Sequence, residues 1–486
     1  MKTNCKQKNF SFSFTIFLLL CVSIFTLCYM GVDSFVGDEL VTLGFIRYDN
    51  SFRDLIHIFL TDEVTNPPLY DIFLYFWYRI VPHNEWWLLL PNVVFFVVGL
   101  VSLLGLALKK TMLPFSCIVI ITIGYINPYT FGYLLYDLRS YSMLFMFSSL
   151  TFCYFFYMLE HESLHTRLLY GLILVFMCYT HYFGAITMAF YALLDLFLSI
   201  KSKKKLSWLV PYILVFCTLF PYLLMVFVNA GSRLGSFWPK NPEIKDILIT
   251  FAQLSGNEFI FAVLLIAGIC YFCSIVLNKK SIPFEMLTAL YLIASTVICI
   301  FVYSKFINPA SSLYVNHYFT AIKPQFLFVC AYIISYLLET IIQKYNLTVK
   351  NHFLSIELVL CITLLLASTF LSAKWYDRQL FRTPFTRYMA KAIKHDIETG
   401  TDAKEIAVYG YSGHYANGYA DFYLSDDDQK GVSFFSSIEK IQNDYSKIYV
   451  FHDIYNDEEK RTELENTLPK YHFEITNSDV AYLKHD

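Results

Sequence analysis

The sequence predicts a polytopic α-helical membrane protein that ends in a small soluble α/β domain. Of its 486 residues, 56% are hydrophobic and 16% are charged, and the mean hydropathy is +0.48. Soluble domains usually carry about 25% charged residues. Residues 373–486 differ from the rest, because they hold 14 basic and 20 acidic residues. We therefore expect a transmembrane domain over 1–372 and a soluble domain over 373–486.

Ten apolar runs are candidates for membrane passes, since a bilayer core about 30 Å thick needs about 20 apolar residues per helix. The runs are 10–30, 88–108, 111–126, 140–159, 168–200, 206–228, 259–277, 286–303, 318–338 and 353–372. The run at 168–200 is too long for one pass, and we expect two short helices that meet around Gly184. The sequence thus predicts about 11 transmembrane helices.

The distribution of basic residues predicts the orientation. With 11 passes and a cytoplasmic N-terminus, 14 of the 23 basic residues before position 373 lie on the cytoplasmic side. A single pass at 168–200 would place the lysines of 201–205 on the opposite face from Lys109 and Lys110, against the positive-inside rule. We therefore predict a multi-pass protein of the cell or inner membrane with an extracytoplasmic C-terminal domain.

Shorter patterns predict the segments outside the bilayer. Residues 31–87 should form one long outer loop with juxtamembrane helices, and the short apolar stretch 69–81 should lie in the interface. The C-terminal domain has strand patterns at 405–411 and 447–452 and helical patterns at 384–399, 437–444 and 457–468.

Charge and cysteine usage exclude two classes of protein. The net charge is −2 and no basic stripe is present, so we expect no nucleic-acid partner. All of the 12 cysteines except Cys5 lie in apolar runs, which is not the pattern of a disulfide framework. Cys270 and Cys273 have a C-x-x-C spacing inside such a run, and we expect them to pack rather than to bind a metal.

Ionisable residues at outer helix ends are the first candidates for a functional site, because charges at membrane depth are costly. Asp38 and Glu39 follow the first pass, Glu63 precedes a Pro-Pro helix start, and Asp137 and Arg139 lie at the outer mouth of the fourth pass. From the residues alone, ordinary roles are equally open: a solvated acidic pair, an acidic helix cap and an arginine that snorkels to the interface.

The order of the motifs along the chain resembles a known family. The series is Asp38-Glu39, Asn66-Pro67-Pro68-Leu69-Tyr70, Leu89-Leu90-Pro91, Asp137-Leu138-Arg139-Ser140-Tyr141, Tyr179-Thr180-His181-Tyr182-Phe183-Gly184, and His317-Tyr318 with Pro324. Over roughly residues 12–340 it is similar to the bacterial branch of glycosyltransferase family 39. That family has the GT-C fold and is related to dolichyl-phosphate-mannose protein mannosyltransferases and the lipid A aminoarabinose transferase.

The resemblance implies an enzyme that moves a sugar, with inversion, from a polyprenyl-phosphate carrier to a lipid, glycan or protein acceptor on the outer face. It implies that Asp38 is the base, and we count Glu39 and Glu63 as further catalytic candidates. The predicted residues for donor phosphate and substrate are Arg139, Asp137, Tyr141, His181, Tyr182 and His317.

Three positions depart from the family pattern. Asn66 stands where the family has histidine, Asp137 where it has glutamate, and His317 where it has arginine. Asn66 argues against a metal or proton role at that position. His317 is a weaker cation than the arginine that the family has late in the chain.

The predicted chemistry fits the residues without the resemblance. Displacement of a phosphate-linked sugar needs a carboxylate for the acceptor proton and a cation for the leaving phosphate. An arginine near the interface can bind phosphate with two donors. A divalent metal on the carboxylate pair is a further option, although the sequence shows no full ligand set.

Two other classes of protein stay open. A transporter or flippase of lipid-linked sugars tends to have mid-bilayer charges and internal repeats, whereas here the charges gather at outer helix ends and no repeat is found. A polysaccharide polymerase or ligase is also embedded in the membrane, but its main catalytic loop lies late in the chain.

Overall fold

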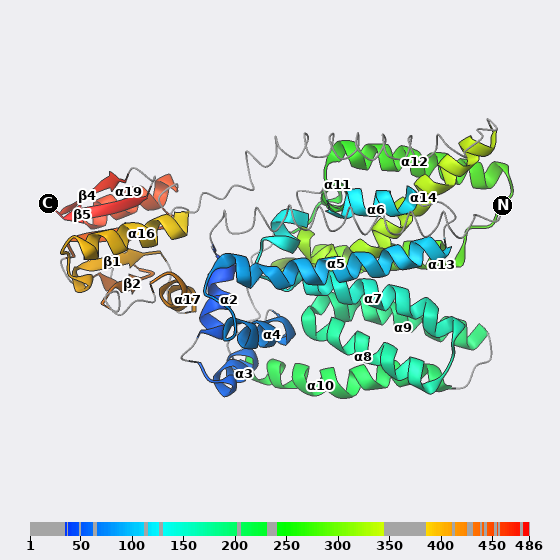
Figure 1. Cartoon of the computed structure of the whole chain (residues 1–486), viewed down its shortest axis with the longest axis horizontal. Helices are drawn as coiled ribbons and strands as arrows, with labels where there is room; N and C mark the ends of the chain where they lie inside the picture. The colour runs from blue at the N-terminus through cyan, green and yellow to red at the C-terminus, as the bar shows by residue number, and fades with distance from the viewer. Residues whose placement is uncertain are drawn as a thin grey trace.

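The computed structural model describes residues 35, 37–47, 50–61, 66–110, 115–125, 130–201, 206–230, 241–344, 385–410, 414–424, 431–437, 440–441, 445–451, 454, 457–476 and 480–485. Long apolar helices form a bundle, and a small sheet unit lies beyond one end of it (Figure 1). The short helices α2 (Asp38–Ile46), α3 (Phe52–Thr61) and α4 (Leu69–Tyr78) lie at that end of the bundle. The helix predicted at 69–81 is confirmed as α4, and its position in the membrane interface stays a prediction.

The bundle is built from the predicted apolar runs. Its elements are α5 (Glu85–Lys110), α6 (Phe115–Tyr125), η1 (Thr130–Leu135), α7 (Tyr141–Glu160), α8 (Leu164–Thr180), α9 (Tyr182–Lys201), η2 (Leu206–Leu209), α10 (Val210–Ala230), α11 (Ile244–Ser255), α12 (Glu258–Leu277), α13 (Phe284–Val302), η4 (Tyr303–Ile307), η5 (Pro309–Ser311), η6 (Asn316–Ile322) and α14 (Lys323–Lys344).

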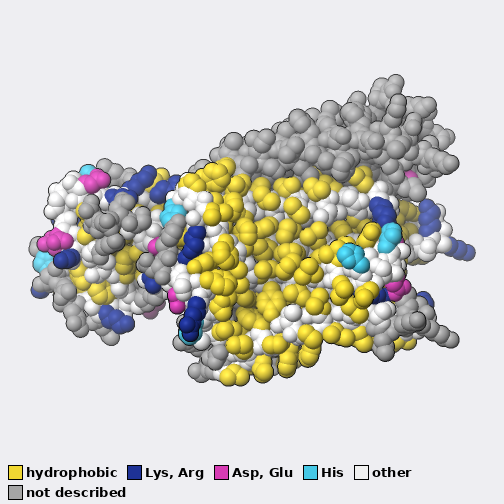
Figure 2. Space-filling model, turned by 60° about the horizontal axis from the view of Figure 1, so that its bottom comes forward, with side chains coloured by type: hydrophobic (Ala, Val, Ile, Leu, Met, Phe, Trp, Pro, Cys, Tyr) yellow, Lys and Arg dark blue, Asp and Glu magenta, His cyan; other side chains and the backbone are white. Residues whose placement is uncertain are grey.

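Seven helical stretches among the described residues are long and apolar enough to cross a membrane, and α8 is a shorter apolar helix. Figure 2 shows a broad hydrophobic band over the bundle, with charged side chains at both of its ends. Such a band fits a bilayer core, where charges are expensive. The predicted passes at 10–30 and 353–372 lie outside the described residues, so the total of 11 stays a prediction.

The long run at 168–200 forms two helices, as predicted, but they meet at His181 rather than around Gly184. His181 has an extended backbone, with φ −163° and ψ 142°, between α8 and α9. A Cβ on Gly184 would lie 2.5 Å from the carbonyl oxygen of Met177. Glycine is therefore needed for the close approach of α9 to the end of α8, and the break itself precedes it.

Arg79 links the end of α2 to α4 through hydrogen bonds. Its Nη1 donates to the carbonyl oxygen of Ile46 at 3.1 Å, and its Nη2 donates to the carbonyl oxygens of Arg47 at 3.0 Å and Asn50 at 2.8 Å. A cation at the C-terminal end of a helix also interacts favourably with the helix dipole. The first short helices are thus held as one layer.

The C-terminal unit has a five-stranded mixed sheet in the order β2-β1-β3-β5-β4. Strand β1 pairs in parallel with β2 and β3, and β5 pairs antiparallel with β3 and β4. The elements are α16 (Phe385–Glu398), η7 (Ala403–Glu405), β1 (Ile406–Tyr409), α17 (His414–Tyr423), β2 (Ser433–Phe435), β3 (Lys447–Val450), α19 (Glu458–Thr467), β4 (Tyr471–Ile475) and β5 (Ala481–His485).

The structure confirms the strands predicted at 405–411 and 447–452 and the helices predicted at 384–399 and 457–468. Most of the helix predicted at 437–444 lies outside the described residues, as does the predicted domain boundary at 372. The small C-terminal α/β unit is therefore present, and its exact limits stay a prediction.

Candidate active site

The predicted base and the predicted phosphate ligand lie side by side. Asp38 is the first residue of α2 and follows Gly37, whose φ of 54° favours glycine. Its side chain is 77% exposed. A guanidinium nitrogen of Arg139 lies 3.7 Å from the Asp38 carboxylate. The structure thus joins two motifs that are far apart in the sequence.

The contacts that Arg139 makes within the described part of the chain are long. Its Nη1 lies 3.5 Å from the Asp38 carbonyl oxygen and 3.4 Å from the Thr42 hydroxyl, at the far limit of a hydrogen bond. Burial disfavours the charged form, but Tyr141 and the carboxylates of Asp38 and Asp137 outweigh it and raise the pKa of Arg139 above its ordinary value. The guanidinium is therefore a permanent cation with weakly engaged donors.

The segment that carries Asp137 and Arg139 is a bend before α7. The Arg139 backbone N–H donates to the Asp137 carbonyl oxygen at 2.7 Å. The Glu39 carboxylate accepts from the Leu138 N–H at 3.0 Å and is only 2% exposed. Such a buried carboxylate fits an orienting role better than a catalytic one, because it binds the backbone of the bend.

A pocket lies beside Arg139. It is lined by Thr42, Phe45, Phe59, Asn66, Tyr70, Asp71, Arg139 and Ser140. Asn66 and Tyr70 belong to the predicted motif, whereas Asp71 was missed, although a carboxylate in the first turn of an apolar helix is a visible signal. Burial, together with the charge of Asp71, raises the pKa of Tyr70, so its phenol stays protonated. The lining combines a cation, a carboxylate and aromatic rings.

Asn92 connects the pocket wall to the bend. Its buried amide oxygen accepts from the Tyr70 hydroxyl at 2.9 Å and from the Ser142 hydroxyl at 2.8 Å. Its amide nitrogen donates to the Asp137 carbonyl oxygen at 2.8 Å. Sequence reasoning missed Asn92, although a single amide inside an apolar run is a signal of this kind. It ties α5, α4 and α7 to the segment that carries Arg139.

Replacing Asn92 with leucine should lower the melting temperature of the protein. The change removes the partner of two buried hydroxyls, those of Tyr70 and Ser142, and of the part-buried Asp137 carbonyl, and a lost buried hydrogen bond costs about 1–3 kcal/mol. Thermal unfolding of the purified full chain measures the effect. Ser102→Ala on the same helix is the control, since that hydroxyl donates to the Val98 carbonyl of its own helix in an exposed hydrogen bond. Equal stability of the two variants would contradict this role of Asn92.

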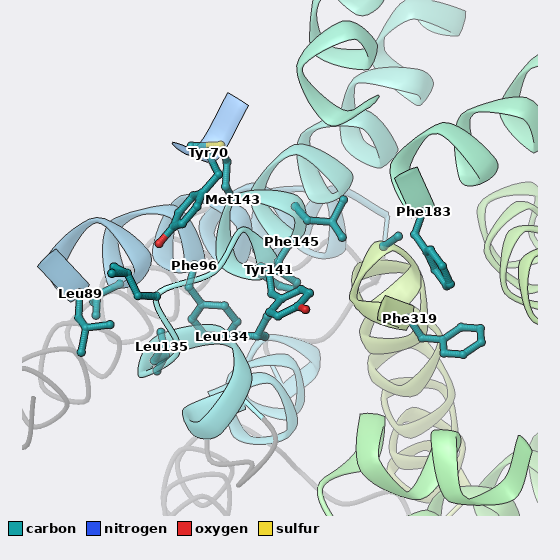
Figure 3. Close-up of a cluster of buried hydrophobic side chains, with 14 of the residues drawn as sticks. Tyr70, Leu89, Phe96, Leu134, Leu135, Tyr141, Met143, Phe145, Phe183 and Phe319 are labelled. Atoms are coloured by element: carbon teal, nitrogen blue, oxygen red, sulfur yellow. The ribbon is translucent and has the colours of Figure 1, made fainter. Parts of the chain in front are cut away.

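His181 and His317 lie in an aromatic cluster around Tyr141, whose ring centroid is 5.9 Å from that of His181 and 5.0 Å from that of His317. Tyr318 lies 4.8 Å from both imidazoles. The His181 Nδ1 accepts from the Phe183 N–H at 3.2 Å, while its buried Nε2 has no hydrogen-bond partner in the described part of the chain. Figure 3 shows Tyr141 and Phe183 among the buried side chains of this region.

The remaining predicted residues are less directly placed. Glu63 lies outside the described residues. Tyr182 is half-buried at the start of α9, and neither it nor the two histidines line the pocket beside Arg139. Within the described ranges, no three His, Cys, Asp or Glu side chains are grouped so that they could hold a metal ion. The divalent metal therefore stays a prediction.

In its fold, the chain is similar to solved membrane glycosyltransferases with the GT-C fold. No family model matches the sequence, and no curated protein matches it either. In structure, the chain is similar to ArnT from Cupriavidus metallidurans bound to undecaprenyl phosphate, with a TM-score of 0.54 and 13% identity over 96% of this chain and 97% of that one.

A second similar structure is the archaeal oligosaccharyltransferase AglB from Archaeoglobus fulgidus, in complex with an inhibitory peptide and a dolichol-phosphate. Its TM-score is 0.50, at 10% identity over 97% of this chain and 74% of that one. ArnT and AglB are both GT-C enzymes, so the fold predicted from the resemblance is confirmed. With this fold and its apolar helices, the chain is an integral membrane protein.

Proposed function

We propose that this protein is a glycosyltransferase that moves a sugar, with inversion, from a polyprenyl-phosphate carrier to a lipid, glycan or protein acceptor. The observation that carries the proposal is the pairing of an exposed carboxylate, Asp38, with a cation, Arg139, beside a pocket at the end of a GT-C bundle. The ArnT structure holds undecaprenyl phosphate and the AglB structure holds a dolichol-phosphate, and both polyprenyl phosphates support the choice of carrier.

The reaction is a displacement at the anomeric carbon of the sugar. The acceptor oxygen forms a bond to this carbon while the bond from the carbon to the carrier phosphate breaks. Asp38 takes the proton of the acceptor, and the polyprenyl phosphate leaves with the electron pair. Arg139 neutralises the charge that develops on the leaving phosphate. Attack from the face opposite the phosphate inverts the configuration.

The aromatic cluster supports the predicted substrate-binding roles of His181 and His317. The buried Nε2 of His181 has no partner in the described part of the chain, and a buried polar atom without a partner is costly. Arg139 lies close enough to both rings to act on them electrostatically. A sugar or phosphate oxygen between these groups would supply the missing hydrogen bond.

Transfer from a radiolabelled polyprenyl-phosphate hexose tests the proposed function. The full chain is reconstituted in liposomes with the labelled carrier and with envelope fractions as acceptors. We expect labelled acceptor and free polyprenyl phosphate to appear together, and mass spectrometry of surface glycans from a deletion strain then identifies the acceptor. A carrier that crosses the bilayer with its glycosidic bond intact would instead identify a flippase.

We place the site and the C-terminal unit on the extracytoplasmic side. Lys109 and Lys110 end α5 and form ion pairs with Glu160 and Glu285, so basic residues gather at the end of α5 remote from Glu85. The positive-inside rule makes that end cytoplasmic. Glu85, at the other end of α5, pairs with Arg387 of the C-terminal unit.

Protease added to intact spheroplasts should therefore remove the chain beyond about position 375, because the C-terminal unit then faces the medium. Immunoblotting with a C-terminal tag measures the loss. A tag inserted at 202–205, on the predicted cytoplasmic side, is the control and should survive until the membrane is permeabilised. Protection of the C-terminal tag in intact spheroplasts would reverse the assigned orientation.

A further inference from the structure

Helix α17 of the C-terminal unit packs directly against α2, the helix that begins with Asp38. The two backbones meet at glycines. A Cβ on Gly44 would lie 1.9 Å from the carbonyl oxygen of His414, and a Cβ on Gly418 would lie 1.9 Å from the carbonyl oxygen of Leu40. No side chain fits at either position, so this contact depends on both glycines. Figure 1 shows α17 beside α2.

The same helix also reaches α4 and α5 through hydrogen bonds. The Tyr78 hydroxyl of α4 donates to the Asp421 carboxylate at 2.7 Å. The Tyr423 hydroxyl donates to the Glu85 carboxylate at 2.9 Å and accepts from the Phe35 N–H at 2.8 Å. Three elements that are separate in the sequence are thus joined by one helix of the C-terminal unit.

Glu85 is a buried carboxylate in this interface. Its side chain is 10% exposed, and Arg387 of α16 donates to the same Glu85 oxygen through Nε at 3.1 Å and Nη2 at 2.9 Å. Removal of the C-terminal unit would take both the arginine and the phenol away from this buried carboxylate, which is costly. The interface is therefore specific and not merely a contact between neighbouring surfaces.

The helices that α17 joins are those that carry the site. Helix α2 provides Asp38 and Thr42, α4 provides Tyr70 and Asp71, and α5 provides Asn92. The contact also reaches the pocket wall, because the ring of His414 lies 4.7 Å from that of Phe45, which lines the pocket. Arg139, by contrast, lies on the bend before α7, which α17 reaches indirectly, through α2 and through Asn92 of α5.

We propose that α17 positions the site: it holds α2, α4 and α5 in the arrangement that places Asp38 against Arg139 and shapes the pocket. The C-terminal unit is then part of the catalytic centre rather than an appended module. This inference rests on the proposed function for its effect on catalysis. Loss of the contact shifts the base relative to the cation, and a displacement of about 1 Å can cost about 100-fold in rate.

The test compares Gly418→Ala with Asn417→Ala in the reconstituted full chain. Asn417 is the exposed neighbour on the same helix and serves as the control. Hydrogen exchange of peptides from α2 and α4 reports positioning, and kcat is followed separately from binding of undecaprenyl phosphate. We expect faster exchange in both helices and about a 10- to 100-fold lower kcat for Gly418→Ala, with carrier affinity within about threefold, because α17 does not hold Arg139 directly.

A milder variant covers the case in which Gly418→Ala does not fold. Tyr78→Phe removes one hydroxyl from the interface and should give smaller changes in the same direction. Unchanged exchange in α2 and α4 in both variants, or a wild-type kcat despite faster exchange, would overturn the inference. The hydrogen-exchange measurement does not depend on activity. A wild-type chain that shows no sugar transfer would therefore refute the proposed function. The positioning by α17 would still be tested by hydrogen exchange.

Discussion

Replacement of Asp38 by asparagine is expected to lower sugar transfer about 10²- to 10⁴-fold, the usual cost of losing a general base. Asparagine keeps the shape of the side chain but cannot take the acceptor proton. Because Asp38 is 77% exposed, the neutral amide meets no burial penalty, and the folded protein should insert normally. The measurement is the rate of transfer from the labelled carrier at saturating concentration, with the amount of folded protein determined in detergent.

Glu39→Gln is the matched control for Asp38→Asn. The amide oxygen of glutamine can still accept from the Leu138 N–H, so the bend keeps its support and most activity should remain. Glu63→Gln is tested beside it because Glu63 was a candidate from the sequence. Near-normal turnover in Asp38→Asn, combined with loss in Glu39→Gln or Glu63→Gln, would move the role of the base to that residue.

Measurement of carrier binding separates the effect of Asp38→Asn on catalysis from its effect on phosphate binding. The carboxylate contributes to the environment of Arg139, from which it lies 3.7 Å away. Removal of this negative charge leaves the guanidinium more attractive to a phosphate. We therefore expect undecaprenyl phosphate to bind the variant at least as tightly as it binds the wild type, so that the loss appears in kcat alone.

The membrane helices could be predicted because their signal is local. An apolar run such as 259–277 needs only its own composition to identify α12. The break at His181 could not be placed as well, because the close approach of Gly184 to Met177 is a tertiary contact. The C-terminal strands β2, β4 and β5 were also missed. They are only three to five residues long, so each offers too short a pattern for strand prediction.

The site could be predicted only in its separate parts. Asp38 and Arg139 each stood out as charges at helix ends, but their contact joins residues 101 positions apart. Phe45 and Phe59 of the pocket wall look like any core aromatic residue in the sequence. The role of α17 could not be predicted either, because the need for glycine at positions 44 and 418 arises only from the packing of the two helices against each other.

Arg139 should bind the phosphate of the donor, and its replacement by alanine should abolish both carrier binding and turnover. The side chain is 15% exposed, and its contacts with Asp38 and Thr42 are between 3.4 and 3.7 Å long. Arginine donors that are so weakly engaged can turn to a phosphate without breaking strong bonds. A phosphate carried by a lipid at this depth offers charge-assisted hydrogen bonds, which are about twice as strong as neutral ones.

The lysine variant separates the charge of Arg139 from its shape. Arg139→Lys keeps a cation but loses the planar fork that binds two phosphate oxygens, so we expect weaker carrier binding and partial activity. Arg53→Ala, which removes an exposed arginine from the neighbouring α3, is the control and should bind the carrier normally. Binding of undecaprenyl phosphate and transfer from the labelled donor are measured separately. If Arg139→Ala binds the carrier as the wild type does, then Arg139 only anchors the bend at the interface, and the phosphate is held by other residues of the outer end.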